Sequence, residues 1–321
     1  MIDFRKKYTG FVTMVIVLFV FLTACDGKQE LMIASVPDQT AQPTSLPTAT
    51  PLPSQTSTPA PTFTPTVTPV VVLDPEPIEI SFVTEDGAEL YGIYYPAEEN
   101  PAPILVLVHW AKGGLTEWEQ IAPWLQDRGL FVRSTDYNHS WKSSDWYPES
   151  SVEGPLGIFA FTLRECTGGC QSYLPVEWLL DIQAAMEKVS GLQGVDKDRI
   201  LTAGASIGAD GALFGCAWLN QTELGHCKGS FSLSPASLLT VPYEELARQL
   251  IDSVPPLPLY CLYGLRDDAS VETCSDLPGL HSVDYGYIEN HGMELIQPGQ
   301  NPDPLILLSE FINTSLERVG E

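Results

Sequence analysis

Residues 199–217 read RILTAGASIGADGALFGCA and place a short apolar strand directly before a glycine-flanked serine and a helix of small residues. The centre of this stretch, residues 204–208, is a single G-x-S-x-G motif. A serine on a strand-to-helix turn is held in a strained backbone that exposes its hydroxyl, and the helix N-terminus favours negative charge beside it. We therefore interpret Ser206 as a nucleophile. The competing interpretation is a Gly/Ser-rich turn in which Ser206 is only a helix N-cap.

Apolar runs on either side of this motif alternate between strand and helix periodicity. Asp86-Gly87 is a tight-turn signal between two alternating segments, which predicts a leading hairpin. The expected strands are 78–83, 89–95, 104–108, 130–133, 199–203, 230–233, 258–263 and 282–287. The expected helices are 115–128, 176–189, 209–219, 243–252 and 304–316. This order predicts an α/β fold with a mostly parallel, doubly wound sheet and an N-terminal antiparallel hairpin.

A serine nucleophile needs a base, and the base needs an acid that orients it. Of five histidines, His291 has the most suitable position, because it follows the last expected strand in the loop Glu289-Asn290-His291-Gly292. The acid is expected just past the strand 258–263, where carboxylates reach the functional edge of an open parallel sheet. Asp267 and Asp268 both qualify, and a solvated turn is the alternative for each.

The chain order Ser206, Asp267, His291 resembles that of α/β-hydrolases, and residues 76–321 resemble the serine-esterase and dienelactone-hydrolase-like branch of that superfamily. The motifs that carry the resemblance are the hairpin at 84–90, the strand end at 106–109, the G-x-S-x-G turn, the G-x-x-D at 264–267 and the His-Gly at 291–292. The resemblance implies an α/β-hydrolase fold and selects Asp267 over Asp268. Dienelactone hydrolases carry cysteine at the nucleophile, so Ser206 favours a serine esterase.

The same resemblance implies an oxyanion hole built from two backbone N–H groups. One belongs to Ile207, and the other to the loop that begins at His109, where we choose Ala111. Trp110 stands where relatives often have glycine, and we expect it to line the substrate pocket together with Trp141. Residues 138–174 are rich in aromatic side chains and predict either a lid or an insertion packed on the surface.

The first 75 residues differ in composition from the rest. Three basic residues precede a twelve-residue apolar run and the sequence Leu-Thr-Ala-Cys25, which resembles a bacterial lipoprotein signal with Cys25 as the lipidated residue. Within residues 37–69, 22 of 33 positions are Pro, Thr or Ser, which favours an extended spacer. We therefore expect a signal peptide at 1–24, a lipidated spacer at 25–75 and a hydrolase domain at 76–321, anchored outside the cytoplasm in the bacterial cell envelope.

Six cysteines remain once Cys25 is set aside, and an even number in an exported domain predicts disulfides. We expect pairing between sequence neighbours, with a zinc site at Cys166 and Cys170 as the alternative. The expected pairs are 166–170, 216–227 and 261–274.

The charge balance of 16 Lys and Arg against 41 Asp and Glu excludes nucleic acid as a partner. We predict a hydrolase that cleaves small carboxylic esters through an acyl-enzyme, without a metal or cofactor. Acyl transfer or peptide hydrolysis on the same three residues is an alternative. Another is a catalytically silent binding protein on the same fold, since fold alone does not fix function.

Overall fold

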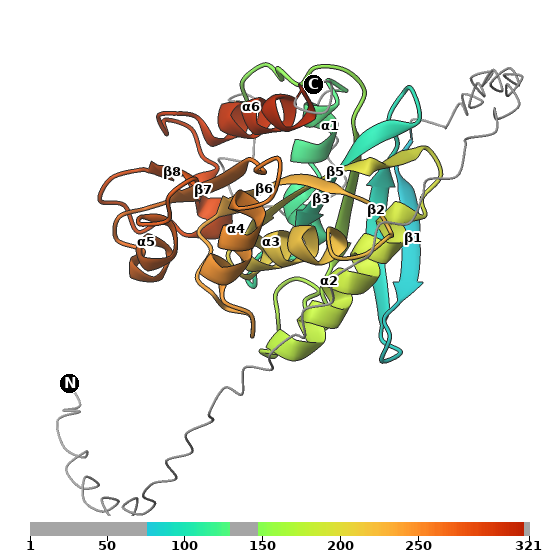
Figure 1. The fold of residues 1–321 in the computed structure, drawn as a ribbon, viewed down its shortest axis with the longest axis horizontal. Helices are drawn as coiled ribbons and strands as arrows, with labels where there is room; N and C mark the ends of the chain where they lie inside the picture. Colours follow the sequence, from blue (N-terminus) through green and yellow to red (C-terminus); the bar gives the residue numbers. More distant parts are fainter. Residues whose placement is uncertain (1–75, 129–146, 318–321) are drawn as a thin grey trace, which may run out of the picture. The chain divides into compact units, whose positions relative to one another are not determined.

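The computed structural model describes residues 76–128 and 147–317, which belong to one compact unit of the chain, Pro65–Glu321. Their strands form an eight-stranded sheet with the order β1-β2-β4-β3-β5-β6-β7-β8 (Figure 1). The strands are β1 (Ile78–Val83), β2 (Glu89–Tyr95), β3 (Ala102–Val108), β4 (Gly157–Thr162), β5 (Val195–Ala205), β6 (Cys227–Leu233), β7 (Leu259–Tyr263) and β8 (His281–Asp284). The helices are η1 (Leu115–Trp118), α1 (Ile121–Leu125), α2 (Pro175–Ser190), α3 (Ile207–Leu219), α4 (Tyr243–Ile251), α5 (Asp268–Cys274), η4 (Gly292–Leu295) and α6 (Pro304–Glu317).

The sheet begins antiparallel and continues parallel. β2 pairs with β1 and with β4 in antiparallel register, whereas every pairing from β4–β3 through β7–β8 is parallel. Every residue of β3 is buried, as expected for a strand covered on both faces. The predicted doubly wound sheet with an N-terminal hairpin is confirmed.

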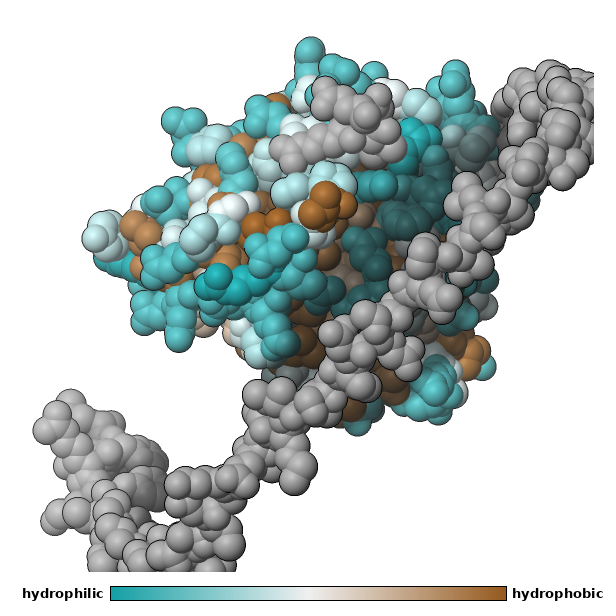
Figure 2. Space-filling model, in the orientation of Figure 1, coloured by the Kyte–Doolittle hydropathy of each residue, from teal (hydrophilic) through white to brown (hydrophobic). Residues whose placement is uncertain are grey.

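Two hydrophobic cores lie on opposite faces of the sheet. One contains side chains of α2, α3 and α4, and the other contains side chains of α1, η4 and α6, an arrangement that can be followed in Figure 1. Fully burying a large apolar side chain contributes about 1.5–3 kcal/mol, so these two layers supply the main driving force for the fold. Hydrophilic residues dominate the face of the molecule in Figure 2, with apolar residues scattered singly or in small groups.

The structure corrects the prediction for residues 138–174. β4 lies inside this range and pairs with β2 and β3, so Phe159 and Phe161 are buried core residues and belong to no lid or surface insertion. The all-apolar run from Gly157 to Phe161 is the pattern of a strand buried on both faces, and its aromatic content obscured that pattern.

The helix predicted at 115–128 is also corrected, because the chain forms the short helix η1 and then α1. Pro123 has no N–H to donate and is accommodated in the first turn of a helix, so a new helix begins just before it. The strand predicted at 130–133 lies outside the described residues. Among the described helices, none combines the length and the apolar character that a membrane span requires.

Candidate active site

Ser206 lies between β5 and α3 in a backbone conformation that side chains rarely adopt, with φ 53° and ψ −124°. Such a conformation costs on the order of 1–3 kcal/mol and persists only where the surroundings impose it. The Ser206 N–H donates to the Leu233 carbonyl at 2.8 Å, which ties the turn to β6. A Cβ on Gly204 would stand 1.9 Å from the Gly208 carbonyl oxygen, so the turn closes only with glycine there.

His291 connects this serine to a carboxylate. Its Nε2 lies 2.7 Å from Ser206 Oγ, and its Nδ1 lies 2.6 Å from Asp267 Oδ2. The Ser270 hydroxyl donates to the same Asp267 oxygen at 2.6 Å. Asp268, the other candidate acid, is exposed at the start of α5. The structure thus brings together Ser206, His291 and Asp267, each from a different part of the sequence.

Two backbone hydrogen bonds bring the acid and the histidine into reach of each other. Past the end of β7, the Leu265 N–H donates to the Gly286 carbonyl at 2.7 Å, and the Arg266 N–H donates to the Ile288 carbonyl at 3.2 Å. These bonds join the loop that contains Asp267 to the segment that leads into His291. All three groups therefore lie at the C-terminal edge of the parallel strands, where open α/β sheets place their sites.

The two residues expected to donate to an oxyanion lie in different segments, one directly after Ser206 and the other in the loop after β3. Ile207 is the first residue of α3, so its N–H has no acceptor within the helix. Ala111 lies in the loop that follows β3, and its carbonyl accepts from the Cys170 N–H at 2.7 Å. The Cys166–Cys170 disulfide closes the segment that makes this contact, so the bridge supports the loop that contains Ala111.

His109, at the start of the same loop, is fully buried and does not belong to the Ser206–His291–Asp267 group. The Leu163 N–H donates to its Nε2 at 3.0 Å, so the ring proton is on Nδ1, which donates to the Trp110 carbonyl at 2.7 Å. Burial lowers the pKa of His109 to about 4, so the ring is neutral near pH 7. His109 therefore fixes the loop that contains Ala111 to the chain just after β4.

Trp110 is 5% exposed and is therefore buried rather than open to solvent. A Cβ on Gly292 would meet Trp110 Cε3 at 3.0 Å and Ser206 Cβ at 3.4 Å, which places the indole close to Ser206. Its predicted role in lining the substrate pocket stays a prediction. Trp141, the other expected pocket residue, lies outside the described residues, and so does Cys25.

The three predicted disulfides are confirmed. Cys166 pairs with Cys170, Cys216 on α3 pairs with Cys227 on β6, and Cys261 on β7 pairs with Cys274 on α5. The zinc alternative for Cys166 and Cys170 is wrong, because their sulfurs are bonded to each other. Among residues 76–128 and 147–317, no three His, Cys, Asp or Glu side chains are grouped as a metal site would require.

Asp210 is a buried carboxyl one turn beyond Ser206 on α3. It accepts backbone N–H groups from Ala236, Ser237 and Leu238 at 3.3, 3.2 and 2.7 Å, and so holds the loop after β6 over the start of the helix. Burial raises its pKa to about 7, although the three N–H groups act in the opposite direction. Asp210 therefore connects the loop after β6 to the first turn of α3, next to Ser206.

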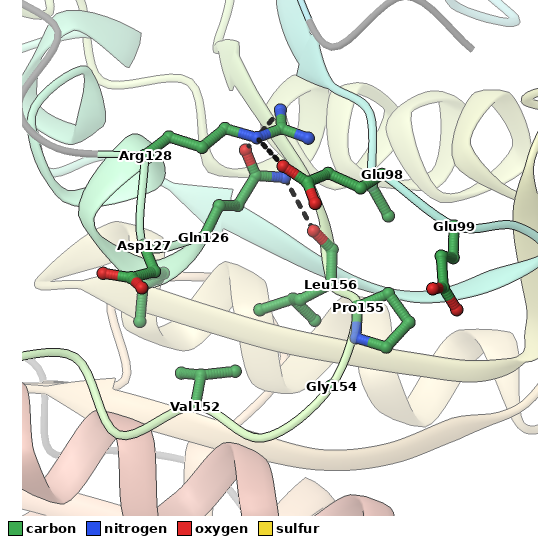
Figure 3. A pocket seen from close by; sticks show the side chains of 11 residues that line it. Glu98, Glu99, Gln126, Asp127, Arg128, Val152, Gly154, Pro155 and Leu156 are labelled. Atoms are coloured by element: carbon green, nitrogen blue, oxygen red, sulfur yellow. Dashed lines mark hydrogen bonds and ion pairs between the residues drawn. The ribbon is translucent and has the colours of Figure 1, made fainter. Parts of the chain in front are cut away.

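A pocket of about 440 Å³ lies away from this site (Figure 3). Its walls include Glu98, Gln126, Arg128 and Leu156, from segments that precede β3 and β4 or follow α1. It therefore opens at the N-terminal edge of the strands, opposite to Ser206. The Gln126 amide donates to the Leu156 carbonyl at 2.6 Å, as Figure 3 shows. This hydrogen bond joins the C-terminal end of α1 to the segment just before β4.

The chain is similar to several solved structures of hydrolases. A hyperthermophilic esterase from the archaeon Pyrobaculum calidifontis is similar over 75% of this chain and 84% of its own, at 12% identity and a TM-score of 0.51. A dienelactone hydrolase from Anabaena variabilis is similar over 74% and 96%, at 14% identity and a TM-score of 0.49. An esterase from Pyrococcus furiosus is similar over 78% and 98%, at 15% identity and a TM-score of 0.46.

No protein-family model matches the chain, and no curated protein sequence matches it either. At 12% identity, the likeness to the Pyrobaculum esterase speaks to fold and not to activity. Together with the strand order and the strand–turn–helix around Ser206, it shows that the described residues have the α/β-hydrolase fold.

Three polar residues near the site escaped the sequence analysis. Ser270 supports Asp267, while Glu294 and Lys112 form an ion pair between the histidine loop and the loop after β3. Glu294 had a local signal, because a glutamate three positions after a helix N-cap residue, here His291, often accepts the backbone N–H of that residue. Lys112 and Ser270 had none, since their contacts depend on how distant loops meet.

Proposed function

We propose that residues 76–321 form a serine hydrolase that cleaves carboxylic esters through an acyl-enzyme. The observation that carries the proposal is the continuous hydrogen-bonded chain from Asp267 through His291 to Ser206, with Ser206 on a strained turn. Side chains in this order and at these distances are the arrangement that activates a hydroxyl for acyl transfer. The Pyrobaculum esterase lends support at the level of fold alone.

In the proposed reaction, Ser206 Oγ attacks the ester carbonyl while His291 Nε2 takes the hydroxyl proton. Asp267 keeps the other ring proton on Nδ1 and stabilises the imidazolium that forms. The N–H groups of Ile207 and Ala111 receive the developing oxyanion, a contribution of roughly 3–4 kcal/mol for each such donor. His291 then gives its proton to the leaving alcohol, and water repeats the sequence on the acyl-enzyme to release the acid.

Labelling with a fluorophosphonate probe tests the nucleophile. Wild type should label and should hydrolyse short nitrophenyl esters, whereas Ser206→Ala should lose labelling and at least about 10⁴-fold in kcat. Ser190→Ala, which removes a hydroxyl at the end of α2, is the matched control and should behave as wild type. Equal labelling of Ser206→Ala and wild type would show that another residue is the nucleophile.

The same assay separates the alternative functions. Wild type that neither labels nor cleaves any ester of the panel would favour a binding protein on this fold. Faster cleavage of peptide nitroanilides than of nitrophenyl esters would favour a peptidase, and faster product formation with an added alcohol acceptor would favour an acyltransferase.

We also propose that Cys25 is lipidated and anchors the protein in the bacterial cell envelope, with residues 25–75 as a spacer. The support is the basic, apolar and small-residue order that ends at Cys25. Cys25→Ser should release the protein from the membrane fraction into the soluble fraction. A Cys25→Ser variant that still needs detergent for extraction would contradict the anchor.

A further inference from the structure

Glu294 holds two active-site loops at once. One carboxylate oxygen, Oε2, accepts the backbone N–H of His291 at 3.3 Å, and the other, Oε1, accepts from Lys112 Nζ at 3.2 Å. Lys112 belongs to the loop after β3 and directly follows Ala111. The carboxylate therefore links the residue proposed as the general base to the loop proposed to hold the oxyanion.

A second set of contacts involves Trp110, which precedes Ala111 in the loop after β3. Lys112 Nζ lies 5.0 Å from the centre of the Trp110 ring, so the lysine side chain reaches across the indole. Gly292 of the His291 loop is also close to this indole, since a Cβ there would approach Trp110 Cε3 to 3.0 Å. The Asn290 amide also donates to the Glu294 carbonyl at 3.0 Å, which fixes the turn in which Glu294 lies.

The Lys112–Glu294 pair contributes little to folding. The two side chains are 66% and 39% exposed, and exposed ion pairs are worth about 0–1 kcal/mol. The pair can still affect the reaction rate through the positions of the two loops, because misplacing a reacting group by about 1 Å can cost about 100-fold in rate. The Lys112–Glu294 pair connects the loop that contains His291 to the loop that contains Ala111. In the proposed reaction, His291 must reach Ser206 while the Ala111 N–H reaches the oxyanion.

We propose that Lys112 and Glu294 are positioning residues that hold the His291 loop and the Ala111 loop at the separation that the reaction requires. The inference rests on the proposed function. Neither side chain touches the reacting atoms; both act through the backbone of the loops that do.

Substitutions that remove one element of the contact at a time test the proposal. Lys112→Met removes the charge but keeps a chain over Trp110, and Glu294→Gln keeps an acceptor for the His291 N–H but removes the ion pair. Each should lower kcat about tenfold with KM and Tm nearly unchanged. Lys112→Arg should restore most of the rate, and the Lys112→Met/Glu294→Gln double variant should lose no more than either single one.

The matched control is the exposed pair Arg248–Glu244 on α4, whose atoms lie 2.6 Å apart at 54% and 60% exposure. Arg248→Met should leave kcat unchanged, because this pair contacts neither loop. Salt at about 1 M screens exposed pairs, so it should narrow the gap between wild type and Lys112→Met. Wild-type kcat in Lys112→Met, or an equal loss in Arg248→Met, would overturn the positioning role.

Hydrogen–deuterium exchange separates this inference from the proposed function. Lys112→Met should speed exchange at residues 291–295, across the gap, and Arg248→Met should not. If wild type proves inactive, the proposed function fails, and faster exchange in Lys112→Met would still support the contact between the loops. Unchanged exchange at residues 291–295 would overturn the inference whatever the activity.

Discussion

Gly208 shows how little room the turn around Ser206 leaves. A Cβ at this position would lie 2.3 Å from the His109 carbonyl oxygen and 2.4 Å from that of Val108, and both are backbone atoms that cannot rotate away. Gly208→Ala should therefore lower the free energy of unfolding by about 3 kcal/mol or more, the upper end of overpacking costs. Urea denaturation of wild type and Gly208→Ala measures this difference in the free energy of unfolding.

The matched control for this prediction is Gly191→Ala at the end of α2. A Cβ there would have its nearest neighbour at 3.7 Å, an ordinary contact, so the free energy of unfolding should change by less than about 1 kcal/mol. Equal stability of the two variants would mean that the turn can open without cost.

His109 predicts a specific loss of stability in acid. The native pKa is about 4 against an ordinary value of 6.5, so between these limits the unfolded chain binds a proton that the native protein does not. Stability is fully present above pH 6.5 and is lost as pH falls towards 4, by roughly 3 kcal/mol in total. The pH dependence of the free energy of unfolding should flatten over this range in His109→Asn.

The comparison isolates His109 because other titrating groups are common to both proteins. Asp210, whose raised pKa acts with the opposite sign, contributes equally to wild type and to His109→Asn. Parallel curves for the two proteins between pH 4 and 6.5 would contradict the assignment of a neutral, buried ring.

At this scale the sequence predicted which three side chains the structure brings together, while their catalytic roles stay predictions. Ser206 lies in a motif, and Asp267 and His291 each follow a strand, so topology brings them to one edge. The support from Ser270 and Lys112 was not predictable, because it arises where loops from distant segments meet. The roles of Ile207 and Ala111 stay predictions.

The segment that contains Asp267, the proposed acid, is closed by the Cys261–Cys274 disulfide. This bridge joins β7 to α5 and encloses Asp267 and Ser270 in one short loop. Replacing both cysteines by alanine should lower the free energy of unfolding by about 3 kcal/mol and should also lower kcat, because the loop around Asp267 loosens. Chemical denaturation and nitrophenyl ester hydrolysis measure the two effects.

The Cys216–Cys227 pair provides a matched comparison. It closes a loop of similar length, with a separation of 11 residues against 13, so its removal should cost similar stability. It lies ten residues from Ser206 along α3, and we expect a smaller loss of kcat. A larger loss of kcat for the Cys216–Cys227 variant would contradict the special role of the acid loop.

Strand prediction succeeded where apolar runs were flanked by turns and failed where aromatic content suggested another role. The hairpin β1–β2 and strands β3, β5, β6 and β7 fall within a few residues of the predicted ranges. β4 was missed, since Phe159 and Phe161 were interpreted as part of a lid or insertion. The position of β4 between β2 and β3 is set by tertiary packing and cannot be predicted from the periodicity of apolar residues.

On the scale of the whole molecule, the charge of the domain predicts how salt acts on it. Residues 76–321 hold 12 Lys and Arg against 36 Asp and Glu, so acidic side chains repel one another over the surface. Raising ionic strength from about 10 to about 150 mM shortens the screening length from roughly 30 to roughly 8 Å. Screening weakens this repulsion and the attraction within exposed ion pairs alike, and with three acids for each base we expect the repulsion to outweigh the attraction. Tm at neutral pH should rise by about 2–4 °C, or about 1 kcal/mol for a domain of this size.

Near the sequence pI of about 4.3 the net charge vanishes, and the same increase in ionic strength should leave Tm almost unchanged. A fall in Tm with salt at neutral pH, measured by differential scanning calorimetry, would mean that pairs such as Lys112–Glu294 outweigh the repulsion.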